Sequence, residues 1–313
     1  MNVLPNILVA LLSFSSFAPS AAKKEDSGTS GKPKVARIIN GTDTGKAIPY
    51  QVALSIMTPT SVGCGGSLIG QKTVLTAAHC YVDENGSLRN PLLDTVGANR
   101  YDITKTAGMI TTTLSYAQLG VDIIPHPDYN MTGEVENDVA LVILPGGLEE
   151  GDNIKYAKLN KDPNVPAADK RLYVSGWGYT EEEGSQSAIL LGTVVNSVPN
   201  KVCSPLVYPE LVLTNGMMCA YTEGTGHCQG DSGGPLVIAS KNKTAPAAEP
   251  PLQVGIVSWA IGGCARKGYP GGYTRVSSYT DWIEKTACVA VDELCPSSKS
   301  GKSSESSKSD MPI

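Results

Sequence analysis

Short runs of alternating or branched apolar residues fill the middle of the chain and predict β-strands. Clusters of Gly, Pro, Asn and Asp separate these runs, as expected of turns. The predicted strands cover residues 52–57, 66–69, 73–76, 139–144, 172–175, 191–198, 234–239 and 253–259. Because helical periodicity is almost absent, the pattern predicts an all-β domain, either a sandwich or barrels.

One helix is predicted near the end of the chain. Ser278 and Asp281 have the spacing of a capping box, in which side chains satisfy the free N–H groups of a helix start. Trp282, Ile283 and Lys285 follow as the first helical residues. The sequence therefore predicts a helix capped by Ser278.

The two ends of the chain differ from its middle. Residues 3–17 are apolar and small residues follow them, so residues 1–22 are interpreted as a secretory signal peptide, too short for a membrane span. Residues 23–37 are polar and rich in Gly, Ser and Lys, and we expect them to be a disordered propeptide. Residues 289–313 form a second low-complexity, disordered tail. One domain, residues 38–288, is expected between them.

Cysteines and glycosylation sequons indicate export. All eight cysteines follow Val62, which fits an oxidising compartment, and the predicted localisation is secreted and extracellular. The sequons that could carry sugar begin at Asn40, Asn85, Asn130 and Asn242. Paired Cys-x-x-Cys or His-Glu-x-x-His spacings are missing and no calcium loop is recognisable, so no metal or other cofactor is expected.

Charge excludes other classes of partner. The formal net charge is −5 and there is no basic stripe, so we expect no nucleic-acid partner. After the predicted signal peptide no apolar run is long enough to cross a bilayer, so we expect no membrane partner.

The candidate nucleophile is Ser232, within Cys-Gln-Gly-Asp-Ser-Gly-Gly-Pro-Leu at residues 228–236. Glycines permit the sharp turn that presents a hydroxyl oxygen, with backbone N–H groups directed at a developing negative charge. Asp231 directly precedes the serine. The alternative interpretation is an ordinary Gly-Asp-Ser-Gly surface turn.

Two further residues complete a candidate catalytic group. His79 ends an apolar strand beside a cysteine, and histidine is a suitable general base because its pKa lies near neutrality. Asp138 opens an otherwise apolar strand, where a buried carboxylate needs a partner. His126 lies between two prolines on a predicted turn and is interpreted as structural.

Five motifs carry a resemblance to a known family. They are Ala-Ala-His-Cys, Asn-Asp-Val-Ala-Leu, Gly-Trp-Gly, the segment around Ser232 and Ser-Trp, at residues 77–80, 137–141, 176–178, 228–236 and 258–259. In this order they resemble the chymotrypsin/trypsin-like serine protease family over residues 38–288. The resemblance implies two antiparallel β-barrels packed face to face with the active site between them, plus a C-terminal helix.

The resemblance also implies a role for each candidate. Ser232 is the nucleophile, His79 is the base and then the acid, and Asp138 orients His79. The N–H groups of Gly230 and Ser232 form the oxyanion hole. The expected protein is a serine endopeptidase that hydrolyses peptide bonds through an acyl-enzyme.

Substrate contacts follow from the same likeness. Ser258, Trp259 and Ala260 pair with the substrate backbone, and Ser258 lies close to Asp138. The expected partners are protein or peptide substrates, an activating protease and proteinaceous protease inhibitors, and the protein is expected to be a monomer.

The junction of Arg37 and Ile38 predicts a zymogen. In the family, cleavage at such a junction frees an apolar N-terminus, whose ammonium pairs with the carboxylate before the nucleophile, here Asp231. The expected switch is therefore the ion pair of Ile38 with Asp231.

Cysteine pairing cannot be chosen from the sequence alone. The resemblance implies Cys64–Cys80, Cys203–Cys219 and Cys228–Cys264. Cys288 and Cys295 lie beyond the shared pattern and are paired by elimination.

The primary pocket departs from that of trypsin. Gly226 lies six residues before Ser232, where trypsin-like members carry an Asp, so the sequence predicts no preference for Arg or Lys and favours apolar residues. Gly271 resembles the glycine that leaves a pocket open, whereas Ala260 could narrow its entrance. His227 is either a neutral wall residue or, when protonated, a site for acidic residues. Activation at Arg37 then requires another protease.

Two rival functions fit the sequence less well. A catalytically silent homologue, acting as a binding or inhibitor protein, usually lacks a triad member, but His79, Asp138 and Ser232 are all present. An esterase of the nucleophile-elbow type is contradicted by the chain order His, Asp, Ser.

Overall fold

The computed structural model describes residues 38–55, 60–83, 86–89, 95–114, 122–129, 135–208, 210–241, 245–246 and 250–295, which belong to one structural unit. The predicted signal peptide and propeptide with Arg37, most of the tail, residues 56–57 of the first predicted strand, and Asn85, Asn130 and Asn242 lie outside the described residues.

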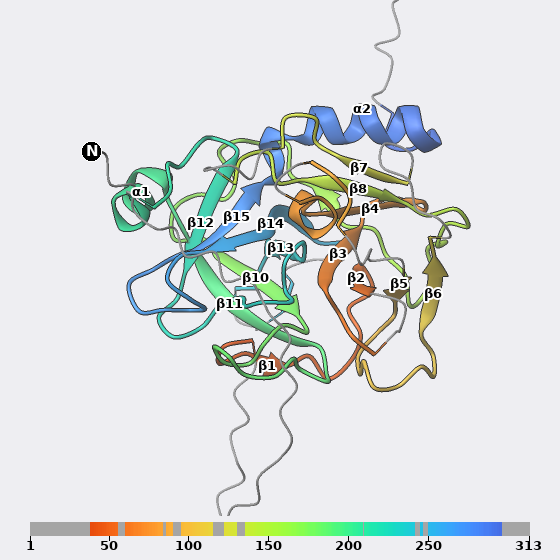
Figure 1. Cartoon of the computed structure of the whole chain (residues 1–313), viewed down its shortest axis with the longest axis horizontal. Coiled ribbons are helices and arrows are strands. Elements are labelled where there is room, and N and C mark those ends of the chain that lie inside the picture. The colour runs from red at the N-terminus through yellow and green to blue at the C-terminus, as the bar shows by residue number, and fades with distance from the viewer. Residues whose placement is uncertain are drawn as a thin grey trace, which may run out of the picture. The chain divides into compact units, whose positions relative to one another are not determined.

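The first half of the domain is a seven-stranded antiparallel sheet (Figure 1). Its strand order is β6-β5-β2-β3-β4-β8-β7. No ladder joins its two edge strands within the described residues, so this sheet is a half-barrel. The strands are β2 (Gln51–Ser55), β3 (Cys64–Leu68), β4 (Thr73–Thr76), β5 (Thr95–Ala98), β6 (Ile110–Thr113), β7 (Ile123–Pro125) and β8 (Ala140–Ile143).

The second half is a closed barrel. Its strands follow the order β1-β11-β10-β13-β14-β15-β12, and an additional β11–β12 ladder closes the ring. The strands are β1 (Thr42–Asp43), β9 (Lys158–Leu159), β10 (Arg171–Gly176), β11 (Leu191–Val198), β12 (Met217–Tyr221), β13 (Pro235–Ile238), β14 (Leu252–Ala260) and β15 (Gly271–Arg275). The all-β prediction with two barrels is confirmed.

Two α-helices are described, α1 (Asn200–Val207) and α2 (Thr280–Val291), together with short 3₁₀ turns at Ala78–Cys80 and Val276–Ser278. The predicted C-terminal helix is present as α2, but the predicted cap is wrong. Tyr279 is the N-cap and no side chain caps the helix. Ser278 ends the preceding 3₁₀ turn and donates its hydroxyl to Asn215 O at 3.0 Å, so it cannot serve α2. No described helix is both long and apolar enough to span a bilayer.

Buried polar bonds join the two sheets. The N–H of Gly65 in β3 donates to Ser232 O at 2.7 Å. Ser67 Oγ, also in β3, donates to Gln253 Oε1 of β14 at 2.7 Å. The Ser67–Gln253 bond is buried, which strengthens it, and the Gly65–Ser232 bond attaches the candidate nucleophile to the first half of the domain.

Disulfides use all eight cysteines of the chain. The bonds are Cys64–Cys80, Cys203–Cys219, Cys228–Cys264 and Cys288–Cys295, which are the four predicted pairs. Two of them flank the candidate site, because Cys80 follows His79 and Cys228 begins the segment of Ser232.

Candidate active site

Strand pairing brings His79 and Asp138 together. β4 and β8 are antiparallel neighbours, with Thr76 opposite Ala140. His79 follows β4 in a 3₁₀ turn, and Asp138 lies two residues before β8. Antiparallel pairing sets the end of one strand beside the start of the other, so two residues far apart in sequence meet at one edge of the sheet.

Asp138 is completely buried and holds His79 by two hydrogen bonds. Its Oδ2 is 2.7 Å from His79 Nδ1, and its Oδ1 accepts the backbone N–H of His79 at 2.9 Å. Ser258 Oγ donates to the same Oδ2 at 2.5 Å. Burial by itself would raise the pKa of Asp138, but the charge interaction with His79 and these hydrogen bonds outweigh it and lower the pKa below its usual value.

The second barrel also secures the backbone of Asp138. Thr274 Oγ1 of β15 donates to Asp138 O at 2.7 Å. Next to it, Asn137 has a left-handed backbone and its Oδ1 accepts the Tyr279 hydroxyl at 3.0 Å. Sequence reasoning did not find Thr274 or Tyr279, whose only signal was their place in the segment before the predicted helix.

Ser232 lies in a tight turn against the first half of the domain. The N–H of Gly234 donates to Asp231 O at 2.9 Å, and that of Gly233 donates to Val257 O at 2.8 Å. Gly233 has a φ of 78°, and a Cβ there would lie 2.1 Å from Thr76 Oγ1. The residue after Ser232 therefore touches the end of β4, from which the His79 turn begins.

Asp231 is completely buried beneath this turn. Its Oδ1 accepts the N–H of Gly178 at 2.7 Å and its Oδ2 accepts that of Cys228 at 2.9 Å. Burial raises its pKa to about 7 in spite of these bonds. A Cβ at Gly178 would lie 2.5 Å from the Asp231 carboxyl carbon, so the Gly-Trp-Gly motif makes room for the carboxylate.

Ile38, the first residue after the predicted cleavage point, is also completely buried. Ile39 pairs with Gly226 as an isolated bridge. The bridge thus anchors the start of the described chain at Gly226, which is five residues before Asp231 in the sequence. Among the described residues, none supplies a cation paired with Asp231.

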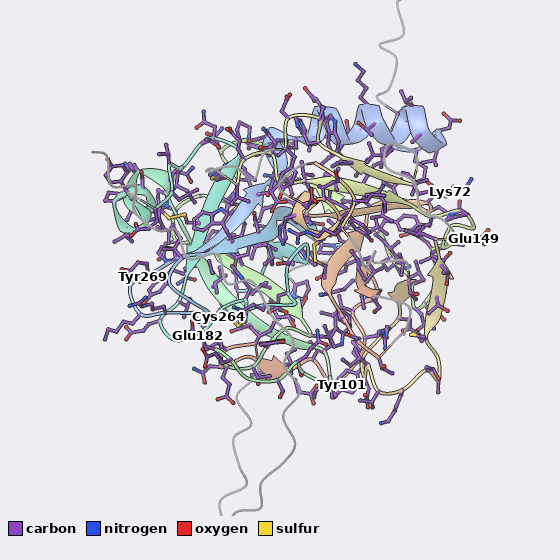
Figure 2. All side chains as sticks on the ribbon, viewed as in Figure 1. Lys72, Tyr101, Glu149, Glu182, Cys264 and Tyr269 are labelled. Carbon is purple, nitrogen blue, oxygen red and sulfur yellow. A yellow bond between two sulfur atoms is a disulfide. The ribbon has the colours of Figure 1, made fainter. Side chains whose placement is uncertain are left out.

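A cavity lies between the segment before Cys228 and the strands β14 and β15. Gly226, His227, Ala260 and Gly271, which the sequence assigned to the primary pocket, all line it, and so does Tyr273, which sequence reasoning missed. Ala260 and Gly271 are opposite one another in the β14–β15 ladder. Ser258 and Trp259 do not line this cavity. Figure 2 labels Cys264 and Tyr269 on the loop from β14 to β15, which forms one side of it.

His227 is buried at the base of the cavity, 5 % exposed. Its ring meets Tyr273 edge-on, with centroids 5.0 Å apart. Burial lowers the pKa of His227 to about 4, so the imidazole is neutral near pH 7. This supports the neutral-wall interpretation of His227 over the protonated one.

The remaining histidine lies in a packed setting. His126 contacts the rings of Tyr279 and Trp282, with centroids 5.4 and 4.9 Å away, and its Nδ1 accepts the N–H of Asp128 at 3.2 Å. These contacts agree with its interpretation as structural.

In the described part of the chain, two groups of side chains have ligand atoms close enough together to bind a metal ion. One group that could surround an ion is Cys64, His79 and Cys80, and the other is Cys288, Asp292 and Cys295. In both, the cysteines are paired in a disulfide, so neither offers a thiolate.

Comparison with known proteins agrees with this geometry. Residues 38–283 match the family model described as Trypsin. A vitellin-degrading protease of Bombyx mori is 34% identical over 256 residues, which cover 80% of this chain and 85% of that protein. Trypsin eta of Drosophila erecta is 35% identical over 254 residues, covering 79% of this chain and 88% of the other. The solved structure of neuropsin, a serine protease expressed in the limbic system of mouse brain, has a TM-score of 0.61 and 29% identity, covering 76% of this chain and 94% of neuropsin.

Proposed function

Because the chain belongs to the trypsin family of serine proteases and is a serine endopeptidase acting on proteins, we propose that Ser232, His79 and Asp138 form its catalytic triad. The observation that carries this assignment is the bond between His79 Nδ1 and the buried Asp138 carboxylate at 2.7 Å. It fixes the ring so that Nε2 is free to act as the base.

In the proposed mechanism, the Ser232 hydroxyl oxygen attacks the scissile carbonyl carbon while His79 Nε2 takes its proton. The C–N bond then breaks, His79 returns the proton to the leaving amine, and an acyl-enzyme remains. Water attacks this ester with His79 again as base, which releases the acid and restores Ser232. The N–H groups of Gly230 and Ser232 stabilise the oxyanion, an effect worth ~10²–10³-fold for one donor.

The proposed active form begins at Ile38. Cleavage after Arg37 would supply an ammonium group, and two features support Asp231 as its partner. Asp231 is buried without a cationic partner in the described structure, and the Ile39–Gly226 bridge anchors the new terminus nearby. A buried carboxylate gains most from such a cation, so cleavage would order the turn around Ser232.

The proposed specificity excludes Arg and Lys and favours apolar residues. Gly226 contributes no carboxylate to the cavity, and the neutral His227 contributes no charge. An enzyme without a preference for Arg activates itself poorly at Arg37, so a separate activating protease is proposed.

The protein is proposed to be secreted, in agreement with its disulfides. Of the sequon residues, Asn40 is described and exposed, and its Nδ2 donates to Gly224 O at 2.6 Å. Asn40 is therefore the sequon residue for which the structure shows a side chain exposed to solvent, as attachment of a glycan requires.

The decisive experiment uses chain cleaved after Arg37 and a radiolabelled phosphonofluoridate, with Ser232→Ala as control. Labelling of the cleaved wild type alone would support the assigned nucleophile and the zymogen. Equal labelling before and after cleavage would overturn the zymogen. If confirmed cleavage gives no labelling, the triad is not assembled, and the silent-homologue interpretation takes its place.

A further inference from the structure

Two buried polar atoms at the primary pocket have no partner. His227 Nε2 and Tyr273 Oη are both inaccessible to water, and the described structure offers neither a hydrogen bond. Folded proteins rarely leave such atoms unpaired, and a bound ligand is one way in which they are completed. Neither atom takes part in the triad chemistry, so their function has to be sought elsewhere.

Both atoms lie beside Gly271, in residues that line the same cavity. A Cβ built on Gly271 would lie 2.7 Å from His227 Nε2 and 3.6 Å from Tyr273 Oη. Gly271 and Gly226 line the cavity together with these two rings. The two polar atoms therefore form the floor of the space that the proposed function assigns to P1, the substrate residue before the scissile bond.

This floor carries no formal charge. Burial lowers the pKa of His227 and raises that of Tyr273, so both groups are neutral at pH 7. Asp231, a neighbouring carboxylate, raises the pKa of Tyr273 further and is hydrogen-bonded beneath the Ser232 turn. A charged P1 side chain would enter without a counter-charge and lose its hydration, which is unfavourable in a buried site.

On the premise of the proposed catalytic triad, we propose that His227 and Tyr273 are specificity-determining residues, and that they shift the preference of the pocket from a purely apolar P1 side chain to an uncharged one with a hydrogen-bonding end, above all glutamine. A neutral imidazole and a phenol each offer one donor and one acceptor, and a primary amide offers both. The methylene groups of glutamine suit the apolar walls of the pocket, and its amide completes the floor. A hydrocarbon of equal length leaves both polar atoms unpaired.

The test compares peptides that differ only at P1, which is glutamine, norleucine, glutamate or lysine. Norleucine matches the length of glutamine without its polar end. Active enzyme is counted by phosphonofluoridate labelling of the cleaved chain, which does not depend on P1. We expect kcat/KM for glutamine to exceed that for norleucine by about tenfold, the effect of one net hydrogen bond. Glutamate and lysine should be cleaved more slowly than either.

Two matched variants assign the effect to the floor. His227→Phe keeps a ring against Tyr273 but removes Nε2, so it should lower kcat/KM for glutamine more than for norleucine and bring the ratio of the two close to one. Tyr273→Phe removes one hydroxyl and should reduce the same ratio. If His227→Phe does not fold, which the labelling reveals, Tyr273→Phe carries the test.

Three results would overturn the assignment. The first is an equal kcat/KM for the norleucine and glutamine peptides in the wild type. The second is a loss of kcat/KM in both variants that is the same for all peptides. The third is a preference for glutamate, which would require a protonated His227. A failure of the proposed function is distinct, because then no labelling occurs and none of the peptides is cleaved.

Discussion

Ser258 Oγ of β14 donates a hydrogen bond to Asp138 Oδ2 at 2.5 Å, and this bond joins the closed barrel to the carboxylate that holds His79. Asp138 is thus oriented by residues of both halves of the domain. The Ser258–Asp138 hydrogen bond can form only when the two halves of the domain are packed together. Loss of this bond therefore tests how far the packing of the two halves stabilises the His79–Asp138 pair.

Replacement of Ser258 by Ala should remove one of the hydrogen bonds that stabilise the ionised Asp138 carboxylate. The pKa of Asp138 is lowered in the folded protein partly by the Ser258 hydroxyl, so Ser258→Ala should raise it towards its usual value. Since a lowered carboxylate pKa stabilises the fold above the unfolded pKa of about 4, the variant should lose stability there, and the loss should vanish as pH falls through the folded pKa. Thermal unfolding from pH 2 to 8 measures it. Ser258→Thr, which keeps the hydroxyl, should behave as wild type; a pH-independent loss would contradict the argument.

In the uncleaved chain, the contribution of Asp231 to the free energy of unfolding should have the opposite pH dependence, falling as pH rises. Its pKa is raised to about 7 by burial, so its favourable contribution is complete below the unfolded pKa of about 4 and is lost as pH rises to 7. Asp231→Asn cannot ionise and should remove this slope, at the constant cost of one of the bonds from Gly178 and Cys228. Thermal unfolding of uncleaved wild type and variant between pH 4 and 8 tests it. Parallel curves would show that Asp231 does not titrate in this range.

Gly233→Ala should disrupt the Ser232 turn. Its φ of 78° is unfavourable for alanine, and the new Cβ would lie 2.1 Å from Thr76 Oγ1 and 2.5 Å from Gly65 O. We expect a loss of about 2–3 kcal/mol in unfolding free energy and at least about a hundredfold loss of kcat/KM. Gly45→Ala is the matched control, because its φ is 71° but no atom lies within 4 Å of the new Cβ. If both variants behave alike, the steric argument is wrong.

Gly226→Asp should change the P1 preference of the enzyme to Arg and Lys. A Cβ at residue 226 meets only Ala265, at 3.7 Å or more, so the new side chain begins without a clash, although the φ of 159° is one that residues other than glycine rarely adopt. A buried pair with a substrate guanidinium should raise kcat/KM for an Arg peptide by roughly a hundredfold. Gly226→Asn, of the same shape without the charge, is the control, and peptide hydrolysis is the readout. An equal gain in both variants would assign the effect to shape alone.

Strands that the sequence predicted carry branched or alternating apolar residues, such as β8 and β11. Two of the strands that the pattern missed have other compositions. β15 begins with two glycines, which are poor strand formers, and β6 is mainly threonine. Gly272 is required there because a Cβ would lie 2.0 Å from the Trp259 ring, a contact that no local pattern reveals. Likewise α1 contains Pro205, and its helical signal was too short to recognise.

Local chemistry alone was enough to identify His79, Asp138 and Ser232 as candidates, since each stands in a motif whose residue types suit one task. Their proximity is a different matter. The β4–β8 register brings His79 to Asp138, and the close approach of Gly233 to Thr76 sets the Ser232 turn against the end of β4, three residues before His79. The charge state of His227 and the floor that it shares with Tyr273 also came only from the fold. The pKa of a side chain depends on its burial and on its distance from other charged groups. Whether a polar atom lacks a hydrogen-bond partner depends on the same two properties. Both properties arise only when the chain has folded.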